Sequence, residues 1–170
     1  MNRSQTRVPC PPPLAALLAL SFLLAGCATP LAFDPAEVAT KLAPWQAAEG
    51  PAQSAMVIWG GAILEVRNLE KQTEIEVLAY PLDRRQRPLP DAPSQGRFIV
   101  VLEGFAEPAD FPADALLTLK GHLFGTREGR IQQSVYRFPI VREANIHVWT
   151  RAELERRVHS HWTFGLGVGL

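Results

Sequence analysis

Apolar and polar residues alternate along much of the chain beyond residue 55, which is the pattern of β-strands with one buried face. In the run Thr73–Leu82, Ile75 and Val77 lie on one face, whereas Glu74 and Glu76 lie on the other. Other runs, such as GRFIVVL, are apolar on both faces and predict strands covered on both sides. The pattern predicts six strands, at Met56–Leu69, Thr73–Leu82, Gly96–Leu102, Ala115–Phe124, Arg130–Phe138 and Ile140–Trp149.

Six strands with few helices predict an all-β domain. Gly125–Gly129 is a short loop bounded by glycines and predicts a hairpin between the fourth and fifth strands. An open sheet would leave its edges free to pair, so we expect a small closed antiparallel barrel of the oligonucleotide/oligosaccharide-binding (OB) type. Gly60-Gly61 fits this expectation, because a long first strand must coil sharply to serve both halves of a barrel. A β-sandwich is the alternative.

Short helices are predicted on either side of the barrel. Asp34-Pro35-Ala36-Glu37 is a helix start that continues to Pro44, and this helix is either a clasp on the barrel or part of a stalk. Thr150-Arg151-Ala152-Glu153 starts a second helix that reaches Val158. The last residues, 162–170, alternate glycine with apolar side chains, and they form either a frayed tail or a strip that packs on the barrel or touches a membrane.

The first 26 residues have the layout of a secretory signal. Arg3 and Arg7 precede the apolar segment Leu14–Leu24, and no acidic residue occurs in this part of the chain. The apolar segment is about half the length of roughly 20 residues that a transmembrane helix needs, so we expect it to be removed.

The segment ends in Leu-Ala-Gly followed by Cys27, which resembles a bacterial lipobox. This resemblance implies that the chain is cut before Cys27 and that its sulfur carries a lipid, with no aspartate at Ala28 or Thr29 to divert the protein from the outer membrane. Two or more acyl chains make membrane attachment effectively stable. We expect a signal peptide (1–26), a lipidated tether with a short helix (27–50), a β-barrel (51–149), and a short helix with a glycine-rich tail (150–170).

Composition narrows the class of protein further. The chain has two cysteines, of which Cys10 lies in the removed segment and Cys27 carries lipid, so disulfides, cysteine-ligated zinc and a cysteine nucleophile are not expected. Lys plus Arg and Asp plus Glu both number 17, and no basic block dominates, so nucleic acid is not an expected partner.

No catalytic residue, metal site or cofactor is predicted. His159 and His161 are two residues apart, but no third metal ligand lies nearby in the sequence. Glu74 and Glu76 share a strand face, but nothing in the sequence encloses them, so their carboxylates should have ordinary pKa values. The serines have no nucleophile-elbow context.

Two candidate binding features remain. Arg84, Arg85 and Arg87 lie in one predicted turn, and arginine binds phosphate oxygens in a bidentate manner, so they are candidates for contact with anionic lipid. Trp59 stands beside Gly60-Gly61, where no side chains would cover its ring, and it is the candidate for stacking on a ligand.

The lipobox is followed in order by VIWGGAI, TEIEVLAYPL, SQGRFIV, GHLFG and VYRFPIV…HVW. Together these segments resemble the Slp family of bacterial outer-membrane lipoproteins, although Gly104–Pro108 and the glycine-rich tail depart from the family pattern. The resemblance implies a protein of the outer membrane that is induced in starvation. It assigns no catalytic residue and no cofactor to this chain. We expect a non-catalytic structural or binding role on envelope components, with the domain in the periplasm. The alternative is a periplasmic ligand-binding or hydrolytic module with a buried pocket.

Overall fold

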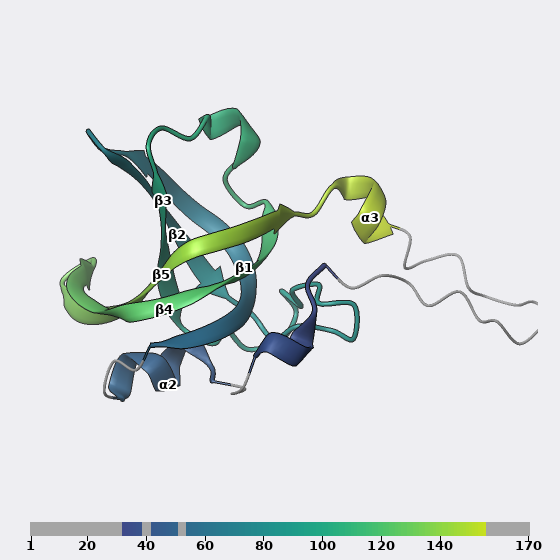
Figure 1. Cartoon of the computed structure of the whole chain (residues 1–170), viewed down its shortest axis with the longest axis horizontal. Helices are drawn as coiled ribbons and strands as arrows, with labels where there is room; N and C mark the ends of the chain where they lie inside the picture. The colour runs from purple at the N-terminus through teal and green to yellow at the C-terminus, as the bar shows by residue number, and fades with distance from the viewer. Residues whose placement is uncertain (1–31, 39–41, 51–53, 156–170) are drawn as a thin grey trace, which may run out of the picture. The chain divides into compact units, whose positions relative to one another are not determined.

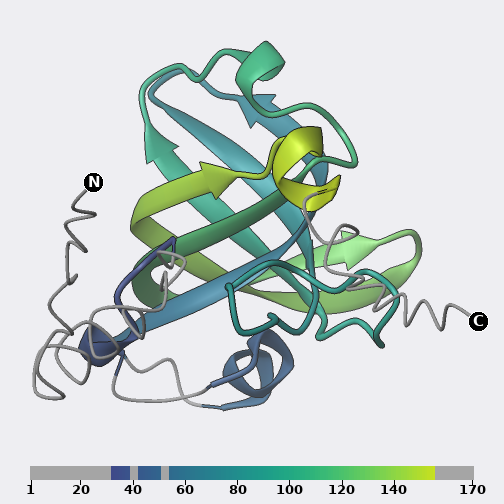
Figure 2. The ribbon, with the colours of Figure 1, turned by 90° about the vertical axis from the view of Figure 1, so that its right-hand side faces the viewer.

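The computed structural model describes residues 32–38, 42–50 and 54–155. The described residues all belong to one compact unit. Its five strands are β1 (Ala55–Asn68), β2 (Gln72–Ala79), β3 (Arg97–Glu103), β4 (Leu116–Ile131) and β5 (Ser134–Val148) (Figure 1). They close into a ring in the order β1-β2-β3-β5-β4, and Figure 2 shows the strands crossing as they wind around the interior. This arrangement confirms the prediction of a small closed all-β fold, although the described residues form five strands where six were predicted.

One pairing in the ring is parallel, where an antiparallel barrel was expected. The strands β3 and β5 run in the same direction and pair at only two positions, Ile99 with Ile140 and Val100 with Val141. All the other neighbouring strands in the ring are antiparallel. We refer to the line along which β3 and β5 meet and then separate as the seam.

The long first strand serves two partners, as its glycine pair predicts. β1 pairs with β4 through residues 55–62 and with β2 through residues 61–68. A Cβ atom on Gly61 would lie 1.9 Å from the carbonyl oxygen of Leu78, so only glycine lets the two backbones approach this closely.

The predicted fifth and sixth strands form a single strand, β5, and the turn before it is displaced. The predicted hairpin loop Gly125–Gly129 lies inside β4, and the chain turns instead at Gln132 and Gln133. Pro139 does not interrupt β5, because it precedes the first residue that pairs with β3 and so needs no hydrogen-bond donor on that side.

The interior of the barrel is filled by apolar side chains. Phe98 is fully buried and packs at a tilt against Trp59, with ring centroids 5.3 Å apart. The other buried members of this core are Ala47, Val57, Ile63, Ile75, Val77, Ala79, Val100, Leu117, Leu119, Leu123 and Val141.

A second, smaller apolar cluster lies on the outside of the ring. It consists of Ile99 and Val101 on β3 and Phe138 and Ile140 on β5, with Ile131 and Tyr136 packed against it. The far end of the β4–β5 hairpin is strongly curled (Figure 1), and its residues contribute to this cluster.

Short helices flank the strands. A 3-10 helix, η1 (Pro35–Glu37), starts where predicted with Asp34 as its cap, but Val38 is already extended. Pro44, predicted to end this helix, instead begins another, α2 (Pro44–Glu49), because proline suits the first helical position. The remaining helices are η2 (Pro108–Asp110) and α3 (Arg151–Glu155), which Thr150 precedes as predicted. Among the described residues, no helix is both long and apolar enough to cross a membrane.

Candidate functional site

The predicted basic turn is a compact loop organised by Asp83. One carboxylate oxygen of Asp83 accepts hydrogen bonds from the backbone N–H groups of Arg85 (2.8 Å) and Arg87 (2.9 Å). The other oxygen accepts from Nε of Arg87 at 2.9 Å and lies 2.8 Å from its Nη2. Burial alone would raise the pKa of Asp83, but these bonds from Arg87 and Arg85 outweigh it and hold the pKa below its ordinary value.

The same loop binds the N-terminal segment through Gln86. The backbone N–H of Phe33 donates to Oε1 of Gln86 and the side-chain amide of Gln86 donates to the carbonyl of Phe33, both at 2.8 Å. Gln86 is buried and has a positive φ of 62°. Its carbonyl accepts a 2.6 Å hydrogen bond from the hydroxyl of Thr118 in β4. We call the two reciprocal hydrogen bonds between Phe33 and Gln86 the Phe33–Gln86 clamp.

The segment after the clamp is also attached to the barrel. The indole N–H of Trp59 donates to the carbonyl of Leu42 at 2.6 Å, and the backbone N–H of Trp45 donates to the carbonyl of Gln95 at 3.1 Å. Of the two alternatives for this segment, a clasp or a stalk, the described residues 32–38 and 42–50 fit a clasp.

The three arginines of the loop have different environments. Arg87 is buried and its guanidinium is paired with Asp83, whereas Arg84 and Arg85 are exposed. If anionic lipid is bound here, Arg84 and Arg85 present the available guanidinium groups, and Arg87 shapes the loop that carries them.

The structure places Trp59 in the core. It is 5% exposed, with its ring against Phe98 and its N–H bonded to the main chain, so little of the ring is open to a ligand. A pocket of about 450 Å³ does adjoin it, lined in part by Val38, Leu42 and Leu82.

A cavity lies at the seam, a position that the strand pattern did not predict. It has a volume of about 1100 Å³ and opens where the end of β3 and the middle of β5 separate. Its walls are residues 101–104 and 142–145, with Lys71, Gln72 and residues 122–124 completing it. Phe124 at this cavity is 69% exposed, and the guanidinium of Arg142 lies 4.5 Å above its ring.

This cavity does not contain a hydrolytic triad. Ser54, His122 and Glu143 all line it, but Nε2 of His122 is 4.0 Å from Glu143 and no hydrogen bond joins Ser54 to His122 in the described part of the chain. Glu143 and His122 are also open to solvent. The cavity is therefore better suited to binding than to acyl transfer.

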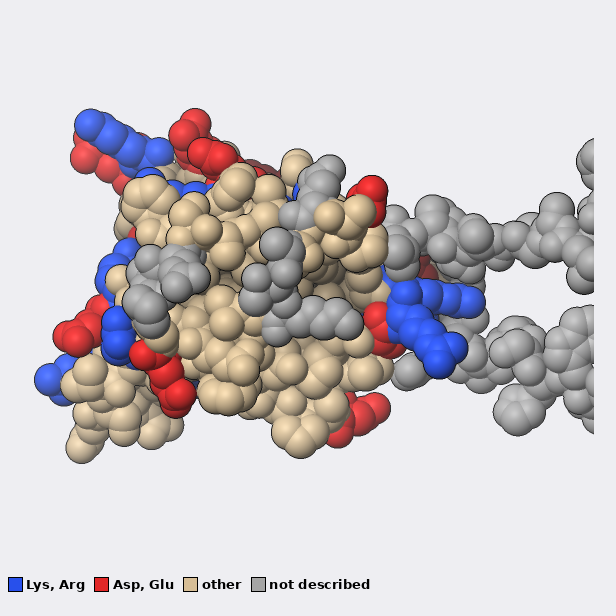
Figure 3. Space-filling model, turned by 60° about the horizontal axis from the view of Figure 1, so that its bottom comes forward, with Lys and Arg blue, Asp and Glu red and all other residues tan. Residues whose placement is uncertain are grey.

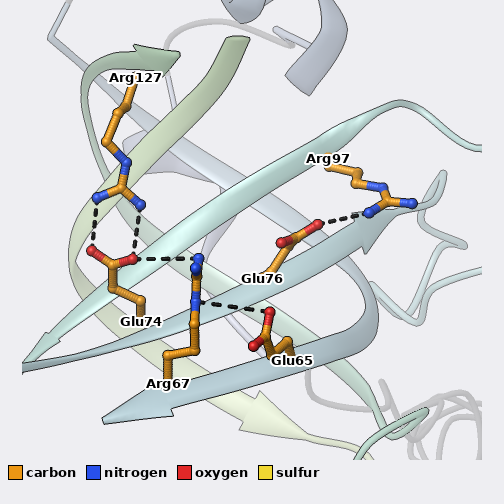
Figure 4. Close-up of polar contacts among 6 residues, drawn as sticks. All are labelled: Glu65, Arg67, Glu74, Glu76, Arg97 and Arg127. Atoms are coloured by element: carbon orange, nitrogen blue, oxygen red, sulfur yellow. Dashed lines mark hydrogen bonds and ion pairs between the residues drawn. The ribbon is translucent and has the colours of Figure 1, made fainter. Parts of the chain in front are cut away.

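The face of β2 and β3 that binds ligands in OB folds carries a network of ion pairs (Figure 4). Arg127 of β4 binds both carboxylate oxygens of Glu74 (2.7 and 2.8 Å), and Arg67 lies 3.5 Å from the same carboxylate. Glu76 is bonded to Arg97 at 2.8 Å. The hydrogen bonds from Arg127 lower the pKa of Glu74, against the opposing effect of burial. Contrary to the prediction from the sequence, Glu74 therefore is enclosed and has a shifted pKa.

Cys27, the predicted lipidation site, lies outside the described part of the chain. So do His159 and His161, for which no metal site was predicted. Within residues 32–38, 42–50 and 54–155, no group of three or more His, Cys, Asp or Glu side chains could hold a metal ion.

A comparison with protein-family models matches residues 24–165 to the outer membrane lipoprotein Slp family. An uncharacterized protein of Haemophilus influenzae is 38% identical over 92 residues, which are 54% of this chain and 50% of that protein. The uncharacterized lipoprotein YeaY of Escherichia coli is 32% identical over 91 residues (54% of this chain, 47% of YeaY). The outer membrane protein Slp of Escherichia coli is 29% identical over 109 residues (64% of this chain, 57% of Slp). The chain thus spans about half the length of these relatives, and no solved structure gives a significant match.

Proposed function

The chain belongs to the Slp family of outer membrane lipoproteins, and from this premise we propose that it is a non-catalytic envelope protein whose barrel is held against a lipid surface. The anchor is lipid on Cys27, and the surface that meets the headgroups is the loop around Arg84 and Arg85. The domain lies on the periplasmic side of the outer membrane. A link to starvation stays a prediction.

The Phe33–Gln86 clamp is the observation that carries this proposal. Phe33 is six positions after Cys27, and six residues span at most about 20 Å when fully extended. Because Gln86 holds Phe33, the lipid on Cys27 cannot be much further than this from the loop. Arg84 and Arg85 are exposed on the same loop, where their guanidinium groups suit phosphate oxygens.

The neighbouring surface is compatible with this orientation. Figure 3 shows the face on the side of α2, where the described residues in the middle are mostly uncharged and the charged side chains lie towards the margins. The helix α2 also carries Trp45, which is 48% exposed, and tryptophan is favoured at the level of lipid headgroups. An uncharged face is brought near a membrane without desolvating many charged groups.

The anchor is tested first. Mass spectrometry of the native protein should find acyl chains on a chain that begins at Cys27, and Cys27→Ser should move the protein out of the membrane fraction. An unmodified sulfur on a membrane-bound protein would contradict the anchor.

The orientation is tested on the purified lipoprotein in lipid nanodiscs. A spin label at Arg85→Cys should collide with nickel-chelating headgroups more often than a label at Ser134→Cys, on the exposed hairpin turn. Adding Gln86→Ala should reduce the difference by releasing Phe33. Equal collision rates at positions 85 and 134 would reject the orientation while leaving the anchor intact.

The contribution of the two arginines is tested without lipid on the protein. We expect Arg84→Ser/Arg85→Ser to weaken binding to phosphatidylglycerol vesicles by roughly 30-fold, since each surface arginine contributes about 1 kcal/mol. Arg130→Ser/Arg137→Ser makes the same charge change on the exposed hairpin and is the matched control. Vesicles containing lipid A show whether the phosphate is that of a phospholipid or of lipopolysaccharide. Equal losses in the two variants would mean that only net charge matters.

A further inference from the structure

The seam between β3 and β5 leaves two strand edges without partners. Beyond Val100 and Val141 the two strands separate. Among the described residues, 101–103 of β3 pair only with β2, and 145–148 of β5 pair only with β4. The backbone groups on the seam side of both edges are available to another strand. The cavity of about 1100 Å³ lies between these edges.

The backbone of β5 turns away from β3 at one residue. Glu143 has a positive φ of 50°, and the register with β4 shifts here, since Lys120 pairs with Asn145 whereas His122 pairs with Arg142. A bulge of this kind bends a strand and ends its pairing on one side. The separation of β3 and β5 therefore follows from the backbone conformation at Glu143.

We propose that the seam binds an extended strand, and that its occupant is the last segment of this chain, Phe164–Leu170. These residues lie outside the described part of the structure, and the proposal concerns them through their sequence and their attachment. Phe164, Leu166, Val168 and Leu170 alternate with Gly165, Gly167 and Gly169, so a strand of this segment has one apolar face and one face without side chains.

The two faces of such a strand match the two sides of the seam. On the inner side, the core is already filled by residues such as Leu123, which is 2% exposed, so only a face of glycines fits there. On the outer side, Phe124 is 69% exposed and would be covered by the apolar face. The same segment in water would expose four large apolar side chains.

The attachment of the segment brings it to the seam. Helix α3 is held against the end of β5, because the carboxylate of Glu153 lies 3.2 Å from Nε2 of His147. His147 is two residues, or about 7 Å, from Asn145 in the wall of the cavity. The eight residues 156–163 can span up to about 27 Å. A short tether of this kind gives an effective concentration of about millimolar.

The main test is crosslinking within the full-length lipoprotein. Cysteines at Asn145 and Val168 should be joined within one chain by a short bis-maleimide, whereas cysteines at Ser134 and Val168 should not. Adding Leu166→Asp to the first pair should abolish the crosslink by burying a charge. The experiment is repeated with Cys27→Ser, so that its outcome does not depend on the proposed lipid anchor. Equal crosslinking at positions 134 and 145 would overturn the proposal.

Hydrogen exchange gives a second measurement. A chain that lacks residues 162–170 should exchange the amides of residues 101–104 and 142–145 at least several-fold faster than the full chain, and an added peptide of residues 162–170 should restore their protection. Unchanged exchange would show that the seam has no strand from this chain. If the crosslink is lost in vesicles and the tail becomes accessible to lipid-borne quenchers, the tail binds membrane and the proposal is wrong.

Discussion

The two apolar clusters of this protein are held in different ways. The core inside the ring is built from side chains such as Phe98, Ile75 and Leu119, and each strand contributes to it. The cluster outside the ring is small, and beside it lie the ion pair of Glu74 with Arg127 and the hydrogen bond between Tyr136 and Arg97. The ring therefore depends on apolar burial, whereas the position of the β4–β5 hairpin depends on a few polar contacts between distant residues.

The largest effect is expected in the inner core. Phe98→Ala should lower the free energy of unfolding by about 3–5 kcal/mol, because it removes a fully buried ring and leaves a cavity next to Trp59. The measurement is denaturant unfolding. Phe105→Ala is the control, since Phe105 is 71% exposed and its loss should change the free energy by less than about 0.5 kcal/mol. Similar losses for the two variants would mean that the ring does not depend on its core.

Arg127→Ala should have the next largest effect. It removes the two hydrogen bonds that Arg127 donates to the carboxylate of Glu74, a side chain that is only 5% exposed. Glu74 then keeps Arg67 and Gln72 as partners. Because Arg127 itself is half exposed, we expect a loss of about 1–2 kcal/mol. Arg130→Ala is the matched control on the same strand. Because the contact between Arg127 and Glu74 positions the hairpin, we expect hydrogen exchange to increase in residues 127–138 and to stay unchanged in β1.

The acid stability of the protein should depend on the same pair. The pKa of Glu74 is lowered in the folded protein from its ordinary value of 4.5, so protonation favours the unfolded chain. Its contribution is complete above about pH 4.5 and is lost as the pH falls through the lowered pKa. The difference in unfolding free energy between the wild type and Glu74→Gln should therefore shrink as the medium is acidified from pH 6 to pH 3. A difference that stays constant would assign the cost of the substitution to packing.

The sequence predicts the strands of the ring better than it predicts where the β4–β5 hairpin turns. Alternation of Ile75 and Val77 with Glu74 and Glu76 located β2 because it follows from local geometry. Local turn signals misled at Gly125–Gly129, because glycines that let a strand curl resemble glycines that end one. A Cβ atom on Gly129 would lie 2.8 Å from the ring of Phe138, a contact that no local pattern reveals.

The candidate site was only partly predictable for the same reason. The arginine turn was visible as a charged run after a strand, but the clamp joins residues 53 positions apart and depends on a positive φ at Gln86. The seam depends on a parallel pairing of only two residue pairs, which carries no sequence signal of its own. For Trp59 the sequence pattern suggested the wrong environment. The neighbouring glycines predicted an indole ring open to a ligand, whereas in the structure they allow close contact between strands.

The smallest predicted effect concerns the hydrogen bond that ties the outer cluster to β3. The hydroxyl of Tyr136 accepts a 2.8 Å bond from the backbone N–H of Arg97, while its ring meets the edge of Phe138 with centroids 4.8 Å apart. Tyr136→Phe keeps the ring and removes the acceptor, so we expect a loss of about 0.5–1.5 kcal/mol in denaturant unfolding. Val135→Thr, at the adjacent exposed position, should change the free energy by less than about 0.5 kcal/mol. If Tyr136→Phe is equally silent, the outer cluster is held by its apolar contacts alone, and the contrast with the inner core is one of size only.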